Sequence, residues 1–467
     1  AIAAPILRAA PVTRATGRAA GLSAMEGLSV MGAVFGEQAS LNHLDCRPMR
    51  PAPSLPLPDE DQLATSRRLS EVIAEAIRAA GGWIGFDAFM ARALYEPGLG
   101  YYSGGSRKFG EAGDFVTAPL ISPLFGRCVA AQLAQWFGQG APEAVYEFGA
   151  GTGALAATVL EALAEAGHDR ARYRIVELSG ELRARQRETL AASVPAMLDR
   201  VEWLDALPER IEGVVLGNEL LDAMPVRLFG LAGGQVVERG VVLAQDSAPG
   251  ASAGPGVPDD PATGRDETPR FAFADRPADP GFERAVRVAL DGAGWAAQGG
   301  WPEGYRSELG EQAAAWIASV GARLARGAVL LIDYGFPRAE YYHPQRAQGT
   351  LICHYRHRSH DDPLWLPGLQ DLTAHVDFSA MDAAARAAGL DTLGYASQAS
   401  FLFGCGLPEL AMRISPDDAG DWARQAAALQ KLVSEAEMGE LFKVIAWGRG
   451  LPDEAIGFAR GDRRGAL

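Results

Sequence analysis

Cysteine is scarce in this chain of 467 residues, which contains four. Cys46, Cys128, Cys353 and Cys405 are scattered, and no two of them form a CxxC pair. This usage argues against a disulfide framework and predicts reduced thiols in an intracellular protein. Long apolar runs are also missing. None reaches the ~18–20 uncharged residues that a membrane-spanning helix needs, so we expect a soluble protein without a membrane span.

Positive charge is in short supply as well. The chain has 43 Lys and Arg residues against 58 Asp and Glu, which gives a formal net charge of −15. A cationic nucleic-acid-binding surface is therefore not expected, whereas the acidic surface can attract a basic protein or peptide. Hydrophobic residues make up 48% of the chain, enough to bury a large core in one elaborated domain or two smaller ones.

Residues 1–58 differ in composition from the rest of the chain, because they are rich in Ala, Arg and Pro and contain few acids, and we assign residues 1–62 to an N-terminal tail. Such a segment is typical of a mitochondrial transit peptide, or of a reading frame that extends ahead of Met25, Met31 or Met49. We favour the second interpretation and expect a disordered tail.

Beyond the tail, short β-rich runs alternate with helical runs. An amphipathic helix is predicted over 63–80, followed by a short helix that Asp87 caps and Pro97-Gly98 ends. Strands alternating with helices predict a doubly wound α/β domain with a parallel sheet covered on both faces. The predicted strands lie at 144–148, 173–178, 200–204, 213–220 and 327–335, and the helices at 129–137, 154–166 and 181–192.

A hairpin interrupts this alternation. It is predicted to turn at Gly233-Gly234, and residues 246–280, rich in Pro, Gly and Asp, are expected to form a solvated loop. Residues 421–447 predict two C-terminal helices. The chain accordingly divides into the tail, a helical and loop cap at 63–137, a core with a glycine loop at 138–225, a hairpin with a flexible insertion at 226–310, and the remaining sheet with its C-terminal helices at 311–467.

The glycine loop is the most informative stretch. In EFGAGTGALA, Gly149, Gly151 and Gly153 lie directly between a predicted strand and a helix. Glycines at such a place let the backbone approach a nucleotide-like ligand that a Cβ would exclude. With Ala154 the spacing also satisfies the dinucleotide pattern G-x-G-x-x-[G/A], so the motif alone is ambiguous, and a plain tight turn is the simplest alternative.

Acidic residues near the strand ends favour S-adenosyl-L-methionine over a dinucleotide. Glu147 would repel a pyrophosphate, but it tolerates a cationic sulfonium and can hold the ligand's ammonium group. Glu177 suits the ribose hydroxyls, as it would in either ligand, and Asp205 is a candidate partner for the adenine amino group. The alternative for Glu177 and Asp205 is that they are ordinary strand-end carboxylates.

Several motifs together carry a family resemblance. They are YEPGLGYY, FGEAGDFVTAP, EFGAGTG, GNELLDAMPV, IDYGFPRAEYYHPQRAQGTL and DLTAHVDF, and the resemblance that they carry runs over residues 63–403. Taken jointly, they resemble the MidA-like family of class I methyltransferases. Gly217 and Met224 depart mildly from the Ala and Leu common in that family, and the tail before Leu63 has no counterpart.

The resemblance implies a Rossmann-like α/β methyltransferase sheet of seven strands, with an N-terminal helical segment, an inserted hairpin region and C-terminal helices. It also implies S-adenosyl-L-methionine as the donor and symmetric dimethylation of an arginine on the quinone-side subunit of respiratory complex I (NADH dehydrogenase). We expect a protein substrate, no nucleic acid, and a homodimer as the candidate assembly. The Ala-, Arg- and Gly-rich composition predicts a bacterial cytoplasmic location, with the mitochondrial matrix as the alternative.

The stretch NELLDAMP supplies the candidate acceptor site. A guanidinium stays protonated at any working pH, and carboxylates that grip two of its nitrogens can localise electron density on the third. Glu219 and Asp222 are the predicted substrate clamp, on one face if the turn is helical, with Asn218 as a polar guide. In the alternative, Asp222 caps a helix and Glu219 is a solvated edge residue.

Two loops add further candidates. In GDFVTAP, Asp114 and Thr117 are expected to close over the donor. The aromatic pair Tyr101 and Tyr102 is expected to form a wall of the methyl pocket or to stack on the guanidinium, with Tyr102 as the site residue. Aromatic residues in a loop before a core helix can equally serve packing alone.

Polar residues recur in two later stretches. In DLTAHVDF, strand alternation places Thr373, His375 and Asp377 on one face, either lining a cleft or on a solvated edge, and we count His375 among the catalytic candidates. Residues 353–362, CHYRHRSHDD, gather potential metal ligands, but their spacing matches no familiar zinc pattern. We expect no metal there and a polar loop.

Other functions remain as alternatives to protein arginine methylation. A methyltransferase for a small molecule would use the same sheet, and a noncatalytic assembly factor of complex I would keep the pocket as a relic. A nicotinamide-dependent oxidoreductase is the most distant alternative, because the dinucleotide pattern is also satisfied.

Overall fold

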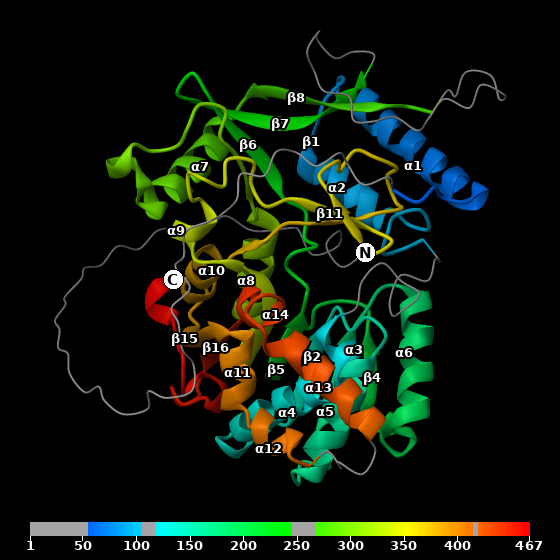
Figure 1. Cartoon of the computed structure of the whole chain (residues 1–467), viewed down its shortest axis with the longest axis vertical. Helices are drawn as coiled ribbons and strands as arrows, with labels where there is room; N and C mark the ends of the chain where they lie inside the picture. Colours follow the sequence, from blue (N-terminus) through cyan, green and yellow to red (C-terminus); the bar gives the residue numbers. More distant parts are fainter. Residues whose placement is uncertain (1–54, 105–116, 245–267, 414–418) are drawn as a thin grey trace. The chain divides into compact units, whose positions relative to one another are not determined.

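The computed structural model describes residues 55–104, 117–244, 268–413 and 419–467 (Figure 1). Residues 1–54 of the predicted tail, residues 246–267 of the predicted loop, and Asp114 lie outside these ranges. The described residues from Pro56 onward belong to one unit. No helix within them is long and apolar enough to cross a bilayer.

A mostly parallel sheet is the centre of the fold. Its strands lie in the order β15-β16-β10-β5-β2-β3-β4, and β14 adds to the end of β10, which makes eight strands with seven of them in one continuous path. All neighbours are parallel except for β16, which is antiparallel to β10 and β15. The bounds are β2 Ala144–Phe148, β3 Arg172–Val176, β4 Val201–Leu204, β5 Ile211–Asn218, β10 Leu324–Phe336, β14 Val376–Asp377, β15 Asp391–Ser397 and β16 Phe442–Arg449. The predicted α/β class with a parallel sheet is confirmed.

Alternation along the strands explains why helices cover both faces of this sheet. In β10, Leu330 packs with the helices of one face and Val329 and Leu331 with those of the other. Burying each such side chain contributes about 1.5–3 kcal/mol. The first face carries α4 Pro123–Gly138, α5 Ala154–Glu165, α6 Gly180–Ser193, α11 Gln398–Gly404 and α12 Leu407–Ala411, and the second carries α8 Glu311–Arg323 and α10 Phe378–Ala387.

A second, antiparallel sheet forms a cap. Its strands are β1 Ile84–Gly85, β6 Arg227–Ala232, β7 Gln235–Leu243, β8 Phe271–Pro277 and β9 Arg306–Leu309, and the predicted hairpin at Gly233-Gly234 joins β6 to β7. Apolar residues of α1 Glu60–Ala79 and α2 Phe86–Tyr95 form one core with those of β7, and Figure 1 shows these elements together. Helix α7 Pro280–Ala293 packs on a further core with β6 and β7.

Two predictions about the cap are wrong. Residues 271–277, expected in a solvated loop, form the strand β8, because β7 supplies hydrogen-bond partners and Arg239 pairs with Asp275 at 2.7 Å. Asp87 does not cap α2. The N-cap is Gly85, which makes no side-chain cap bond, and Asp87 lies in the first turn.

Residues near the C-terminal end also differ from expectation. The first predicted helix exists as α13 Ala419–Val433, but the second is reduced to one turn, α14 Met438–Leu441, before β16. Strand pairing on both edges of β16 overrides the helical spacing of its sequence.

The remaining α-helices and strands are α3 Ala118–Ile121, α9 Arg338–Tyr341, and a small sheet of β11 Ile352–Tyr355, β12 Arg358–His360 and β13 Asp371–Thr373. The polar loop expected at 353–362 is therefore mostly a strand pair.

Candidate active site

A cavity of about 360 Å³ lies at the carboxyl ends of β2, β3, β5 and β10. In open α/β sheets, this is the edge at which ligands bind, because loops there leave a crevice between the strand ends. Helix α2 and the loop after it, which pack against the cap, contribute Tyr95 and Tyr102 to the other side of the cavity. The small sheet contributes Ile352, His354 and Asp371. The site is therefore built from three separate parts of the chain.

The glycine loop forms one end of the cavity. Gly149 and Gly151 both line it, and their φ angles of 69° and 52° are in the left-handed region that favours glycine. A Cβ on Gly151 would meet no atom within 4 Å, so the space beside this residue is free for a ligand. Gly153 is not part of the lining. It is the N-cap of α5 at φ 85°, where a Cβ would come within 3.2 Å of Gln186.

Two buried carboxylates stand next to this loop. Glu147 accepts a hydrogen bond from the Tyr173 hydroxyl at 2.8 Å, and burial raises the pKa of Glu147 to about 7. Glu177 accepts bonds from the Ser179 amide at 2.8 Å and from Gln186 at 3.3 Å, and burial raises its pKa too, while these bonds lower it. Both are 2% exposed and line the cavity, where a cationic ligand would favour their ionised forms.

The other predicted donor-site residues separate into two groups. Thr117, the N-cap residue of α3, lines the cavity. Tyr102, in the loop after α2, lines it as well. Asp205 does not reach it. The side chain of Asp205 is 85% exposed and pairs with Arg183 at 2.6 Å, and Arg183 in turn donates to the Glu177 carbonyl oxygen at 2.7 Å. Arg183 thus draws Asp205 outward, away from the ligand space.

The predicted acceptor residues lie at the end of β5 and directly after it. Asn218, Glu219 and Asp222 all line the cavity, but the turn that carries them is not helical, because Glu219 adopts a left-handed φ of 51°. Asn218 donates to Glu219 at 3.0 Å. Asp222 caps no helix; its carboxylate accepts the Ala223 amide at 2.9 Å.

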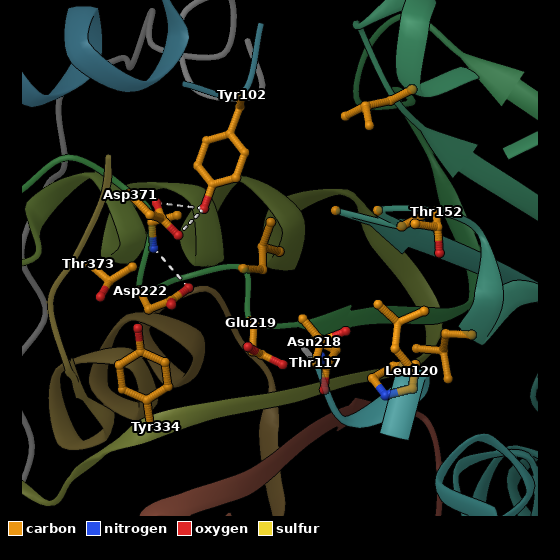
Figure 2. A pocket seen from close by; sticks show the side chains of 18 of the residues that line it. Tyr102, Thr117, Leu120, Thr152, Asn218, Glu219, Asp222, Tyr334, Asp371 and Thr373 are labelled. Carbon is orange, nitrogen blue, oxygen red and sulfur yellow. Dashed lines mark hydrogen bonds between the residues drawn. The ribbon is translucent and has the colours of Figure 1, made fainter. Parts of the chain in front are cut away.

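Burial controls the protonation of this pair. It raises the pKa of Glu219 to about 8, with the negative charge of Asp222 as the next cause, while Asn218 and the Ala118 amide lower it. The pKa of Asp222 rises to about 6, again through burial, and the hydroxyl of Tyr334 opposes the rise. Figure 2 shows that hydroxyl turned toward Asp222. Two carboxylates that are shielded from water and repel each other are suited to a shared cation.

An aromatic wall borders the carboxylate pair. The rings of Tyr95 and Tyr102 stack with centroids 5.5 Å apart, and the Tyr102 hydroxyl bonds to both oxygens of Asp371 at 2.9 Å (Figure 2). Tyr101, the other member of the predicted aromatic pair, is 1% exposed and belongs to the cap core. The sequence reasoning did not single out Tyr95 or Asp371, although both stand in the motifs YEPGLGYY and DLTAHVDF.

The polar row predicted in DLTAHVDF is only partly present. Thr373 and His375 line the cavity, but the strand breaks between β13 and β14. Asp377 instead caps α10 through the Ala380 amide and pairs with Arg338 at 3.2 Å. The His375 ring stacks on Phe336 with centroids 5.2 Å apart, and burial lowers the pKa of His375 to about 4, which keeps the imidazole neutral.

Charge is the property that the described lining residues share most clearly. They include five carboxylates and no Lys or Arg, and the five are Glu147, Glu177, Glu219, Asp222 and Asp371. A cavity of this kind favours cations over phosphate-bearing dinucleotides. Among the described residues, no three His, Cys, Asp or Glu side chains gather in a metal-binding arrangement.

Comparison with known proteins agrees with these features. Residues 128–396 match a family described as "Putative S-adenosyl-L-methionine-dependent methyltransferase". A protein from Burkholderia thailandensis, crystallised with S-adenosyl-homocysteine, is 51% identical to this chain and superposes on it with a TM-score of 0.80. The match covers 89% of this chain and 100% of the Burkholderia protein.

Curated relatives match over most of the chain as well. The mouse (Mus musculus) protein arginine methyltransferase NDUFAF7, mitochondrial, is 30% identical over 77% of this chain and 79% of its own length. The zebrafish (Danio rerio) protein of the same name is 26% identical over 79% of this chain and 84% of its own length. With a family match over more than half of its residues and a cavity at the expected edge of the sheet, the chain belongs to the family of S-adenosyl-L-methionine-dependent methyltransferases.

Proposed function

We propose that this protein is a protein arginine N-methyltransferase. The observation that carries the proposal is the pair formed by the partly buried Glu219 and the buried Asp222, in the same cavity as the glycine loop. Carboxylates are the groups that bind a guanidinium in a fork geometry, and two of them can hold it from more than one side. The names of the mouse and zebrafish relatives support the same acceptor.

The donor end of the cavity fits S-adenosyl-L-methionine. When bound, this cofactor supplies a methyl group activated by its sulfonium. Gly151 leaves room for the ligand, and we propose that Glu147 holds its ammonium group and that Glu177 holds its ribose hydroxyls, since both carboxylates line the cavity. Burial makes each carboxylate costly to ionise alone, so a positively charged ligand gains more from them than a neutral one would.

The acceptor end can orient an arginine for attack. Ionised Glu219 and Asp222 each accept guanidinium N–H bonds, which fixes the plane of the group and leaves one nitrogen free. The stacked pair Tyr95 and Tyr102 offers a flat aromatic surface beside this site, and guanidinium groups stack well on such surfaces. Orientation of this kind can supply up to about 7–11 kcal/mol of a reaction barrier.

A proton must leave the acceptor nitrogen when it gains a methyl group. His375 is our candidate for its destination, because its imidazole is neutral and lines the cavity. Proton transfer to a positioned base contributes about 10²–10⁴-fold, less than alignment does. We therefore expect loss of His375 to be less damaging than loss of Glu219.

The protein partner follows from the family resemblance. We propose that the acceptor is an arginine of a complex I subunit on the quinone side, modified by symmetric dimethylation, and that the enzyme acts in the bacterial cytoplasm as a homodimer. The 51% identity to a protein of Burkholderia thailandensis, against 30% to the mouse mitochondrial protein, supports a bacterial rather than a mitochondrial location.

Labelled methyl transfer tests the proposal. The purified chain is incubated with methyl-labelled S-adenosyl-L-methionine and an extract of cells lacking the gene, and the protein fraction is hydrolysed to amino acids. We expect label in dimethylarginine, and loss of that residue from complex I when the gene is deleted. A variant with Glu219→Gln and Asp222→Asn should still bind S-adenosyl-homocysteine yet transfer no label.

Other outcomes would redirect the assignment. Label recovered in a small molecule would indicate the alternative methyltransferase, and label in another amino acid would overturn the arginine proposal. Donor binding without transfer to any component, together with normal complex I in cells carrying the double variant, would indicate a noncatalytic assembly factor.

A further inference from the structure

Asp333, in the last part of β10, makes an unusual set of hydrogen bonds. Its side chain is 1% exposed, and one oxygen, Oδ2, accepts the consecutive amides of Leu220, Leu221 and Asp222 at 3.1, 2.8 and 3.4 Å. The other oxygen, Oδ1, accepts the amide of Tyr334 at 3.0 Å. Three consecutive N–H groups that converge on one oxygen form a nest, an arrangement that favours an anion.

These amides belong to the segment that carries the proposed guanidinium clamp, residues 219–223, which we call the carboxylate loop. Glu219, at its start, has a φ of 51°, a left-handed conformation that is unfavourable for a residue with a Cβ. Strained backbone of this kind persists only where the surroundings over-determine it. The strain therefore requires bonds from outside the loop.

Such bonds come from three directions. The Glu219 amide donates to the Ile332 carbonyl oxygen at 2.8 Å, the residue before Asp333. Tyr95 donates to the Ala223 carbonyl oxygen at 2.8 Å, and the Ala374 amide to the Asp222 carbonyl oxygen at 3.0 Å. Within this frame, only Asp333 bonds several loop residues at once, so its loss removes more of the restraint than loss of any single partner.

The choice of a carboxylate here is costly for folding. Burial raises the pKa of Asp333, and the nearby charges of Asp222 and Glu219 raise it further. A buried apolar residue would avoid that repulsion, but it would leave three amides without acceptors. An asparagine would also fail, because its NH₂ group would face either the three loop amides or the Tyr334 amide. The presence of the Asp333 carboxylate beside those of Glu219 and Asp222 is explained by the geometry that its hydrogen bonds impose on the loop.

We infer that Asp333 is a positioning residue, which holds the carboxylate loop so that Glu219 and Asp222 present their oxygens to the acceptor. This inference rests on the proposed role of Glu219 and Asp222. Asp333 does not line the cavity, so its effect on the acceptor passes through the loop.

The test is Asp333→Asn in the full chain, measured against the same labelled extract and by structure. We expect methyl transfer to fall about 10- to 100-fold, as for a misplacement near 1 Å, with the affinity for S-adenosyl-homocysteine unchanged within about twofold. A crystal structure of the variant should show Glu219 outside the left-handed region.

Asp382→Asn is the matched control. Asp382 is also a buried carboxylate, which accepts Trp447 Nε1 at 2.9 Å, but it lies on α10 and does not line the cavity. The Asp382→Asn substitution should lower the thermal stability of the protein. It should not lower methyl transfer at a temperature where the variant is folded. Full activity of Asp333→Asn, or an unchanged φ at Glu219 in its structure, overturns the inference. Full activity of Glu219→Gln would instead overturn the proposed clamp, so the two failures are distinguishable.

Discussion

The raised pKa of Glu219 makes acceptor binding depend on pH. A guanidinium binds the ionised carboxylate, whereas burial and the Asp222 charge favour the protonated form up to a pKa of about 8 in the ligand-free protein. Affinity for an arginine should therefore rise as pH increases and level off above pH 8. Glu219→Gln keeps the shape of the side chain but cannot ionise, so it removes this dependence.

The magnitude follows from the distance between pKa and pH. At pH 6, two units below the pKa of about 8, roughly 1% of Glu219 is ionised, which weakens acceptor binding about 100-fold, or ~2.7 kcal/mol. The pKa of Asp222, about 6, adds a further loss below that pH. In Glu219→Gln only this lower part of the profile should remain.

Calorimetry on the complex with S-adenosyl-homocysteine gives the cleanest measurement. This product carries no sulfonium, whose positive charge would lower the pKa of Glu219 and move the profile to lower pH. N-acetyl-arginine amide is the probe and N-acetyl-lysine amide the control, titrated between pH 5.5 and 9. An affinity for the arginine probe that is flat from pH 6 to 8.5, or a Glu219→Gln profile identical to that of the unmodified protein, would refute the reasoning.

The same shift has a consequence for stability, with the opposite sign. A carboxyl whose pKa is raised from 4.5 to about 8 on folding costs the folded state nothing below pH 4.5, an increasing amount up to pH 8, and at most about 5 kcal/mol above it. Glu219→Gln should therefore raise the melting temperature at pH 9 and make little difference at pH 4.5. A variant that is less stable than the unmodified protein at pH 9 would contradict this.

Three further predictions concern the two ends of the cavity. Gly151→Val should weaken S-adenosyl-homocysteine binding at least ~100-fold, because the valine side chain enters the ligand space. Gly233→Val, at a similar φ of 57° in the hairpin, introduces the same backbone strain but should bind S-adenosyl-homocysteine with unchanged affinity. By titration calorimetry, Glu177→Gln should lose about 10-fold in S-adenosyl-homocysteine affinity and the exposed Asp205→Asn less than about twofold, and equal losses would restore Asp205 to the donor site. Tyr102→Phe removes the bond to the neighbouring carboxylate and should raise the KM for the acceptor about 10-fold with donor affinity unchanged, so a change in donor affinity alone would count against an acceptor role.

Local motifs allowed much of the site to be predicted. Gly149, Gly151, Glu147 and Glu177 stand beside one another in the cavity because they lie at or just after the ends of two neighbouring parallel strands, and parallel strands end at one edge of a sheet. The stretch that begins at Asn218 starts at the last residue of a third such strand. Contiguous sequence and the alternation of strands with helices were therefore sufficient for these residues.

Long-range partners were not predictable in the same way. Asp333 has no local signal beyond its place at a strand end, and its role depends on amides more than a hundred positions earlier. Tyr102 and Asp371, 269 positions apart, meet only because the cap and the small sheet enclose the same cavity. Asp205 looked suitable by position, but Arg183 on the neighbouring helix pairs with it outside the site.

The sequence by itself determined the α/β class, the glycine loop, the acidic character of the site and the absence of a membrane-length apolar run, because each is encoded in adjacent residues or simple periodicity. Tertiary structure alone decided that β16 is a strand rather than a helix, since hydrogen bonds to β10 and β15 outweigh its local spacing. It also decided the strained conformation of Glu219, because a left-handed residue with a Cβ is retained only by bonds from segments distant in the sequence.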